Sequence, residues 1–276
     1  MKYLLLITLF LWYSISLAQN CEAYKYYGDT LKYEACKVAK KRAGHYQFSK
    51  EYQIALDKSL KIDSTFDHAY FAKSIAYLKS GDFVTWKKLI DKAVEYNPKD
   101  HLGYRGWCRY QFFSDYKGLI QDIEKLDSLV KYDIGYSQNG TYHLNIAKGL
   151  CYKAIGEKGK AIEIIEKQII LNEKENFVGA YDYLHLGVLY LETENFNKAV
   201  ELFEKQSKDN ELAENQYYLA LAYKNLNKQT EYKSCLEKAK ELYIRQSRMF
   251  DSYSSPMDKI YLKNIENELK TAYNNG

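Results

Sequence analysis

Hydrophobic residues recur every three or four positions along most of the chain, the spacing that places them on one face of an α-helix. The clearest block is Asp67–Asp100, in which Tyr70, Ser74 and Tyr77 share one face of a first predicted helix. A second predicted helix follows and has its own stripe, formed by Phe83, Trp86, Ile90, Ala93 and Val94. The pattern therefore predicts two short amphipathic helices joined by a tight turn.

Two residues set the ends of these helices. Gly81 lies between the stripes, where a residue free to adopt a positive φ commonly ends a helix. Pro98 follows the second stripe and stops it, because proline lacks a backbone N–H and clashes with the preceding turn. We expect the helices at about Asp67–Lys79 and Asp82–Tyr96. Because a pair this small leaves one apolar side uncovered, it must stack on neighbouring pairs, as in repeat arrays.

Similar blocks occur on both sides of this one. After a lead-in over residues 19–32, the predicted repeats cover residues 33–66, 67–100, 101–128, 142–175, 180–213 and 214–246. Val130–Thr141 interrupts the period and contains the turn signal Asn139-Gly140. We therefore expect a long connection at that point.

The end of the chain predicts one more helix. The second helix of the last repeat is expected to continue to about Phe250. Ser255 then suits an N-cap, Pro256 suits the first helical position, and Asp258 follows in the first turn. The stripe in the following residues consists of Tyr261, Ile265, Leu269 and Ala272. Residues 251–276 are thus predicted to form a helix that caps the array against water.

The block Asp67–Asp100 resembles a tetratricopeptide repeat. The residues that carry this resemblance are Tyr70, Ser74, Tyr77, Gly81, Phe83, Ile90, Ala93 and Pro98. Lys73 and Trp86 depart from the family pattern, and the bulk of Trp86 suggests a wider packing between the two helices. The resemblance implies an all-α fold, a right-handed α-α superhelix of about six helix pairs with a C-terminal capping helix. It also implies a scaffold without enzymatic activity or cofactor, similar to exported bacterial repeat proteins.

The first residues, Met1–Ala18, combine one lysine with an apolar run and small residues at Ser16 and Ala18. This is the pattern of a secretory signal peptide that is cleaved after Ala18. A retained membrane anchor is the alternative, but it needs about 20 apolar residues. We therefore expect an exported protein, periplasmic or extracellular, with no integral membrane segment after cleavage.

Charge and composition narrow the partner class. The chain has 40 basic and 36 acidic residues and a net charge of +4, and the two signs are interspersed along it. Such a balance argues against a nucleic-acid partner. The 29 tyrosines supply amphipathic contact area for helix packing and for binding faces.

Motifs with catalytic or metal chemistry are weak. The run Gly156–Ala161 resembles a phosphate-binding loop but lacks its first glycine and its Ser or Thr. The histidines are dispersed and predict no metal site. Among five cysteines, Cys21 and Cys36 are close enough in sequence for a disulfide at the N-terminal edge, although the sequence does not fix the pairing. The other three, Cys108, Cys151 and Cys235, fall at packing positions of their repeats and are expected to be buried free thiols.

The family resemblance also places a binding groove on the first helices of the repeats. The residues proposed for partner contact there are His68, Phe71, Lys79, Arg105, Arg109, Phe112, Phe113, Lys153 and Tyr181. Arginines on an aromatic floor suit an acidic or carboxylate-bearing segment. The alternative for Arg105 and Arg109 is packing along neighbouring helices.

The sequence thus favours an exported, non-enzymatic scaffold that binds a protein or peptide. Two alternatives stay open: a module associated with an envelope enzyme (or itself a hydrolase using acids or histidines on the inner curve), and capture of a small ligand or glycan in the groove.

Overall fold

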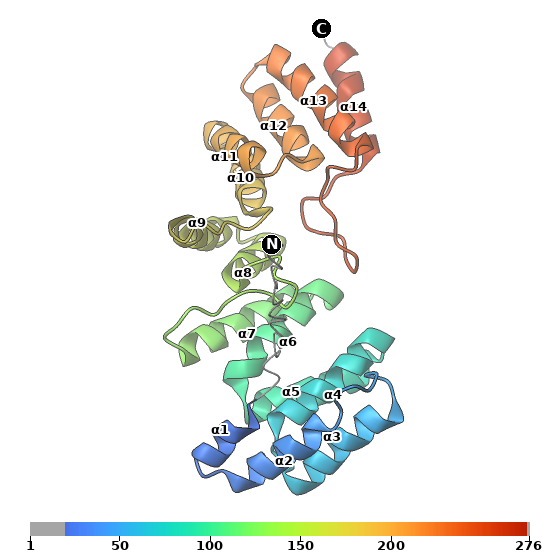
Figure 1. The fold of residues 1–276 in the computed structure, drawn as a ribbon. Coiled ribbons are helices and arrows are strands. Elements are labelled where there is room, and N and C mark those ends of the chain that lie inside the picture. The colour runs from blue at the N-terminus through green and yellow to red at the C-terminus, as the bar shows by residue number, and fades with distance from the viewer. Residues whose placement is uncertain (1–19, 275–276) are drawn as a thin grey trace, which may run out of the picture. The chain divides into compact units, whose positions relative to one another are not determined.

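The computed structural model describes residues 20–274, and within this range it contains fourteen α-helices. The predicted signal peptide, Met1–Ala18, lies outside the described residues. The chain divides into two compact units that meet at Asn97 and Pro98, and each is described separately. The all-α prediction is confirmed (Figure 1).

Unit 1 consists of described residues 20–97 and contains five helices. They are α1 (Cys21–Tyr26), α2 (Thr30–Lys40), α3 (Lys50–Ile62), α4 (Asp67–Ser80) and α5 (Phe83–Tyr96). The predicted lead-in is thus partly helical, as α1. A disulfide joins Cys21 to Cys36 and ties α1 to α2, with Cα atoms 5.6 Å apart. Both cysteines are part of the core between α1, α2, α3 and α4.

The pair α4 and α5 follows the predicted turn chemistry. Gly81 ends α4 with φ of 81°, in the left-handed region that glycine adopts without a steric penalty. Asp82 is the N-cap of α5, and its carboxylate accepts a hydrogen bond of 3.0 Å from the backbone N–H of Thr85. The buried face of α5 consists of Trp86, Ile90 and Ala93. The two helices therefore form where the pattern placed them, within about two residues.

Unit 2, residues 98–274, contains nine helices within the described range. They are α6 (Pro98–Phe113), α7 (Tyr116–Leu129), α8 (Leu144–Ala154), α9 (Lys158–Lys174), α10 (Asp182–Glu192), α11 (Phe196–Asp209), α12 (Ala213–Asn225), α13 (Gln229–Ile244) and α14 (Leu262–Asn274). Consecutive helices pack as sequential pairs, so the predicted architecture of stacked helix pairs is confirmed. Pro98 lies at the first position of α6.

Glycines allow the two helices of a pair to approach closely. A Cβ atom on Gly187 in α10 would lie 2.5 Å from Cε1 of Phe203 in α11, and one on Gly149 in α8 would lie 2.4 Å from Cγ1 of Ile165 in α9. These distances are shorter than van der Waals contact, so no larger residue fits without a shift. The small residues of the sequence pattern are therefore explained by helix contact.

The predictions for the C-terminal end are wrong in two respects. The second helix of the last repeat does not reach Phe250, because α13 ends at Ile244. The next helix does not start at Ser255-Pro256, because α14 begins at Leu262. Asp258 has φ of +64°, which is incompatible with a right-handed helix. The residues between the two helices form a long loop (Figure 1).

The terminal helix α14 nevertheless packs as its apolar stripe predicts. Ile265 and Ala272 are buried against α12 and α13, and Leu269 packs beside them. Tyr261, by contrast, precedes the helix and is 57% exposed. The stripe therefore begins at Ile265, one turn later than expected.

Candidate functional site

The first helices of the pairs in unit 2 hold a segment of the chain's own C-terminal part. We call residues Met249–Ile260 the strap. Four helices bond to it through one side chain each: Gln111 in α6, Lys153 in α8, His185 in α10 and Glu214 in α12. The surface expected to receive a partner is therefore already covered in part by an irregular segment of the chain itself.

Between the buried ends of the strap, Asp258 has a buried side chain that contacts two helices. Its carboxylate accepts a hydrogen bond of 2.6 Å from Nζ of Lys153 and lies 2.7 Å from Nδ1 of His185. The Asp258 side chain is 6% exposed, and that of Lys153 is 8% exposed. Burial raises the pKa of this carboxyl, but the His185 hydrogen bond and the Lys153 charge outweigh it, so the pKa of Asp258 lies below its ordinary value. Lys153 and His185 thus form a receptor for an ionised carboxylate.

Two further side chains, those of Tyr142 and Glu192, contact His185 and Lys153 and orient them toward Asp258. The hydroxyl of Tyr142 lies 3.1 Å from Nε2 of His185, so a neutral imidazole can donate from Nδ1 to Asp258 and accept at Nε2. Glu192 lies 3.1 Å from Nζ of Lys153 and orients the ammonium group. Burial raises the pKa of Tyr142 well above its ordinary value, which keeps the phenol protonated. The Tyr-His-Asp chain therefore orients hydrogen bonds rather than generating a tyrosinate nucleophile.

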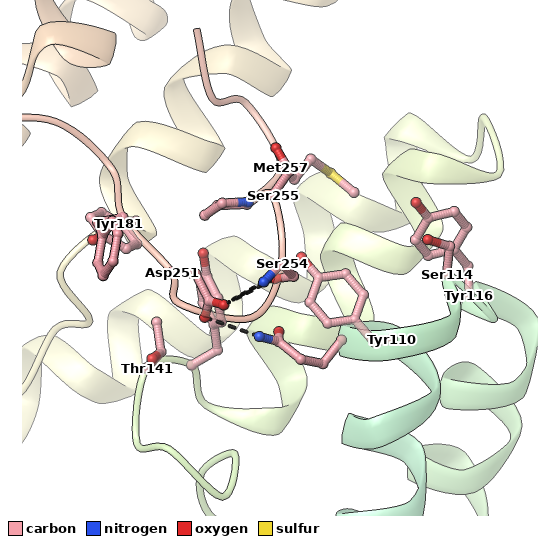
Figure 2. Close-up of a pocket in the computed structure, with 13 residues that line it drawn as sticks. Tyr110, Ser114, Tyr116, Thr141, Tyr181, Asp251, Ser254, Ser255 and Met257 are labelled. Atoms are coloured by element: carbon pink, nitrogen blue, oxygen red, sulfur yellow. Dashed lines mark hydrogen bonds between the residues drawn. The ribbon is translucent and has the colours of Figure 1, made fainter. Parts of the chain in front are cut away.

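A cavity of about 250 Å³ lies between the strap and the helices. Its wall includes Tyr110, Gln111, Tyr142, Tyr181, Pro256 and Met257. Figure 2 shows Tyr110 and Tyr116 on one side of this space, Tyr181 on the other, and the strap residues Asp251 to Met257 passing between them. Nε2 of Gln111 donates a hydrogen bond of 3.0 Å to the Asp251 carboxylate. The strap thus passes over the tyrosines that line the cavity and leaves the cavity itself unfilled.

Both ends of the strap are fixed in the core. Met249 is 1% exposed, and its backbone N–H donates a 3.0 Å hydrogen bond to Oε2 of Glu214. Burial raises the pKa of Glu214. At the other end, Ile260 is 3% exposed and packs with Ala239 and Ile265. The intervening residues are therefore a loop with fixed ends, whose own docking depends mainly on Asp251 and Asp258.

Arg105 and Arg109 lie within their own helix pair. Nε and Nη2 of Arg105 donate to the two carboxylate oxygens of Asp122 in α7, at 2.9 and 2.6 Å. Nη1 of Arg109 lies 3.1 Å from the same carboxylate, which is 3% exposed, and Arg109 also pairs with Asp115. These contacts match the packing alternative, and a role for the two arginines in partner binding stays a prediction.

The expected groove residues of unit 1 lie close to a second hollow. Nε2 of His68 lies 3.0 Å from Nη2 of Arg42, Phe71 packs against His68, and Lys79 bonds to the side chain of Gln47. Arg42 and Gln47 line a hollow of about 330 Å³. Their role in binding likewise stays a prediction.

The remaining expected residues lie around the strap. Lys153 binds Asp258 directly, and Tyr181 lines the cavity. The ring of Phe112 contacts Tyr253 of the strap at a centroid distance of 6.5 Å, and Phe113 packs against Phe112. The structure therefore brings four of the expected residues to one surface of unit 2.

Sequence reasoning missed His185 and the strap itself. His185 is fully buried and is preceded and followed by leucines, which was the one available signal that it needs an internal polar partner. The sequence Ser255–Asp258 has the residues of a helix start, so nothing in it indicates that this segment binds to the first helices of unit 2. That binding depends on Lys153, which lies 105 positions from Asp258 in the sequence.

A larger hollow of about 870 Å³ opens beside the strap, between the loop before α8, the loop that joins α9 to α10, and the C-terminal end of α11. Its lining combines Phe177, Tyr183 and Phe250 with side-chain amides of Asn139, Asn176 and Asn210. Phe177 is 55% exposed and stacks edge-on against Tyr136. An exposed ring beside planar amides is a surface that can accept a small polar ligand.

Residues 20–274 contain neither a metal-binding cluster nor a membrane-spanning helix. In that part of the chain, no three His, Cys, Asp or Glu side chains are grouped in a way that could hold a metal ion. Among the helices of the same range, none has the length and hydrophobicity needed to cross a membrane.

The comparisons with known proteins identify the repeat type. The tetratricopeptide repeat model matches residues 67–100 and 183–208. No curated protein matches the chain. The first match coincides with the predicted repeat 67–100, and the second lies within the predicted repeat 180–213.

Solved structures share the fold at low sequence identity. PilW, described as a widely conserved type IV pilus biogenesis factor, has a TM-score of 0.55 and 13% identity over 92% of this chain and 94% of its own. PilF of Pseudomonas aeruginosa has a TM-score of 0.55 and 16% identity over 81% and 89% of the two chains. Yeast Tom70 has a TM-score of 0.52 and 19% identity, with 92% of this chain covering 49% of that one. At these identities the likeness concerns the fold alone.

Proposed function

We propose that this tetratricopeptide-repeat protein is a non-enzymatic scaffold that binds a protein or peptide partner in the cell envelope or outside the cell. Repeats of this type form scaffolds for protein binding. One observation carries the choice of surface: the first helices of unit 2 already hold an irregular segment of the chain, through Lys153 and His185, which bind its buried carboxylate, and through the tyrosines that line the cavity beneath it. A surface that accommodates the strap has the shape and chemistry to accommodate a partner's segment.

Site-specific photo-crosslinking in living cells tests this function. A benzoylphenylalanine at Phe112, which is 37% exposed beside the strap, is expected to form adducts with a partner on irradiation. The same group at Ile170, 53% exposed on the second helix of a pair, is the control. Adducts at Phe112 and none at Ile170 support the proposal, whereas adducts at neither position, or equally at both, contradict it.

Export is part of this proposal and rests on the N-terminal sequence. The Cys21–Cys36 disulfide supports it, because such bonds persist mainly in oxidising compartments. Cell fractionation with N-terminal sequencing is the test, and a mature chain that begins at Gln19 is the expected result. A chain that keeps Met1 would contradict export through signal cleavage.

A second function is favoured by one observation, the exposed Phe177 in the hollow of about 870 Å³. Side-chain amides beside an aromatic ring suit a glycan or another small polar ligand. Saturation-transfer NMR with neutral oligosaccharides would show ring-proton contacts that disappear in Phe177→Ala. No transfer with any oligosaccharide would leave protein binding as the function of unit 2.

A further inference from the structure

We propose that the strap is an internal occupant of the partner-binding surface, and that the partner is an acidic peptide segment whose carboxylate replaces that of Asp258 between Lys153 and His185. The proposal deepens the proposed function, on which it rests, by naming the partner's chemistry and the contact that must open. Three independent features of the structure lead to it.

The first feature is the receptor. A buried lysine and a buried histidine converge on one carboxylate, and Glu192 and Tyr142 orient them from behind. If the strap leaves, Lys153 and His185 lose a buried counter-charge, which is unfavourable unless another anion takes its place. A segment with an aspartate or glutamate restores the pair, whereas an apolar segment does not. The receptor therefore selects a carboxylate.

The second feature is the way in which the strap is fixed. Met249 and Ile260 are held in the core, whereas the residues between them are joined to the helices mainly through Asp251 and Asp258. Tyr253 is 80% exposed. The middle of the strap can thus leave the surface while its two ends stay in place, and the array of helices need not unfold.

The third feature is the imperfect fit of the strap. A cavity of about 250 Å³ remains beneath it, and Asp258 is held at φ of +64°. A left-handed backbone is uncommon for residues other than glycine, although aspartate tolerates it better than most. A partner segment with an ordinary backbone that also fills the cavity would gain contacts that the strap lacks. The surface is therefore better matched to a ligand than to its own strap.

The strap itself supplies the probe for the test. A fluorescent peptide with the sequence of residues 249–260 is titrated, by anisotropy, against the full-length chain and against Asp258→Asn. This substitution removes the charge and keeps a side chain that tolerates the left-handed backbone. Asp127→Asn, on an exposed position of α7, is the matched control.

We expect the peptide to bind Asp258→Asn at least about tenfold more tightly than the wild-type chain or Asp127→Asn. The reason is that an attached strap competes at an effective concentration in the mM range. A peptide with asparagine in place of the Asp258 equivalent, and a chain with Lys153→Met added to Asp258→Asn, should both lose this binding. Circular dichroism is used to confirm that each variant has the wild-type helix content.

Three results would overturn the proposal. Equal affinity of wild type and Asp258→Asn would show that the strap does not compete. Equal affinity of the acidic and asparagine peptides would show that the receptor does not select a carboxylate. Dimerisation of Asp258→Asn without peptide binding would assign the surface to the strap of a second copy.

Failure here is distinguishable from failure of the proposed function. Crosslinks at Phe112 in cells, together with no peptide binding to Asp258→Asn, would leave the scaffold function in place and remove the strap mechanism. Peptide binding to Asp258→Asn without any crosslink in cells would support the strap mechanism and contradict the proposed scaffold function.

Discussion

The carboxylate of Asp258 lies 2.7 Å from Nδ1 of His185, although the two residues are separated by 73 positions in the sequence. Nζ of Lys153, in another helix pair, completes the contact at 2.6 Å. This meeting joins the loop before α14 to α8 and α10. The contact of Asp258 with Lys153 and His185 therefore fixes the strap on the helices.

Lys153→Met should release the strap, and Lys158→Met should not. Both lysines pair with Glu192, but Lys153 is 8% exposed and holds Asp258, whereas Lys158 is 40% exposed. Removing one partner of a buried pair costs about 3–5 kcal/mol, and an exposed pair contributes about 0–1 kcal/mol. Hydrogen exchange should therefore accelerate in residues 251–258 of Lys153→Met alone. Similar exchange in the two variants would contradict the role of Lys153.

The contribution of Asp258 to strap docking should be constant from about pH 5 to 8 and should weaken below about pH 4. The folded pKa of Asp258 lies below its ordinary value, so its contribution is complete above the unfolded pKa and is lost as the pH falls through the folded one. Lys153 and His185 face the carboxylate directly, with Glu192 behind Lys153 and the phenols of Tyr110 and Tyr218 nearby.

Residue-resolved exchange at 251–258 is the suitable measurement for this pH dependence. Glu214 of α12 bonds to Met249 at the start of the strap, and its pKa is raised. Protonation of Glu214 in acid therefore favours the folded state, whereas protonation of Asp258 weakens strap docking. In Asp258→Asn the acid-induced loss over 251–258 should be absent. Persistence of that loss in the variant would assign the titration to another group.

Asp122→Asn should destabilise unit 2 by about 3–5 kcal/mol, because it leaves two arginines facing a neutral buried amide. The exposed control Asp127→Asn should change the free energy of unfolding by less than about 0.5 kcal/mol. Urea unfolding followed by circular dichroism measures both. Equal stability of the two variants would mean that Arg105 and Arg109 do not depend on Asp122, and would return them to the set of candidate partner contacts.

Gly187→Ala should destabilise the chain, whereas Gly159→Ala should not. The first substitution places a Cβ 2.5 Å from the ring of Phe203, while the second meets no atom within 4 Å in helix α9. Overpacking costs about 1–3 kcal/mol, and an unobstructed Gly-to-Ala change in a helix gains about 0.4–1 kcal/mol. Thermal unfolding midpoints should shift in opposite directions. A midpoint for Gly187→Ala at or above the wild-type value would show that α10 and α11 are not in close contact.

Under denaturing, non-reducing conditions, alkylation of the purified chain should modify three thiols, those of Cys108, Cys151 and Cys235. In the native chain at about pH 8 the reaction should be slow, because burial raises the pKa of Cys108 to about 12 and that of Cys235 to about 11. Mass spectrometry counts the modifications. Five reactive thiols without reductant would show that Cys21 and Cys36 are reduced.

The sequence predicts the helix pairs well because their signals are local. The stripes, Gly81 and Pro98 each specify a helix face or end within a few residues, and the structure follows them. Ser255-Pro256 is an equally good local signal for a helix start, and it is overridden there by a distant contact. Propensity is a weak preference that tertiary contacts can outweigh.

The candidate site was predictable only in part for the same reason. Lys153 and Tyr181 were found from their places in the repeats, which indicate the surface but not its occupant. Arg105 and Arg109 occupy equivalent repeat positions, but both pair with Asp122 inside their own helix pair. No periodic pattern encodes which carboxylate meets which cation, because that depends on the packing of separate helices.

Methyl NMR of the methionines shows directly whether Asp258 holds the strap on the helices. The chain has three methionines, and cleavage after Ala18 would leave two: Met249, at the buried start of the strap, and Met257, beside the cavity. With ¹³C-methyl labelling, we expect Asp258→Asn to sharpen the Met257 signal and move it to the chemical shift of an unstructured chain, and to leave the Met249 signal in place. An unchanged Met257 signal would contradict a strap held by Asp258, and a simultaneous loss of the Met249 signal would show general unfolding in place of strap release.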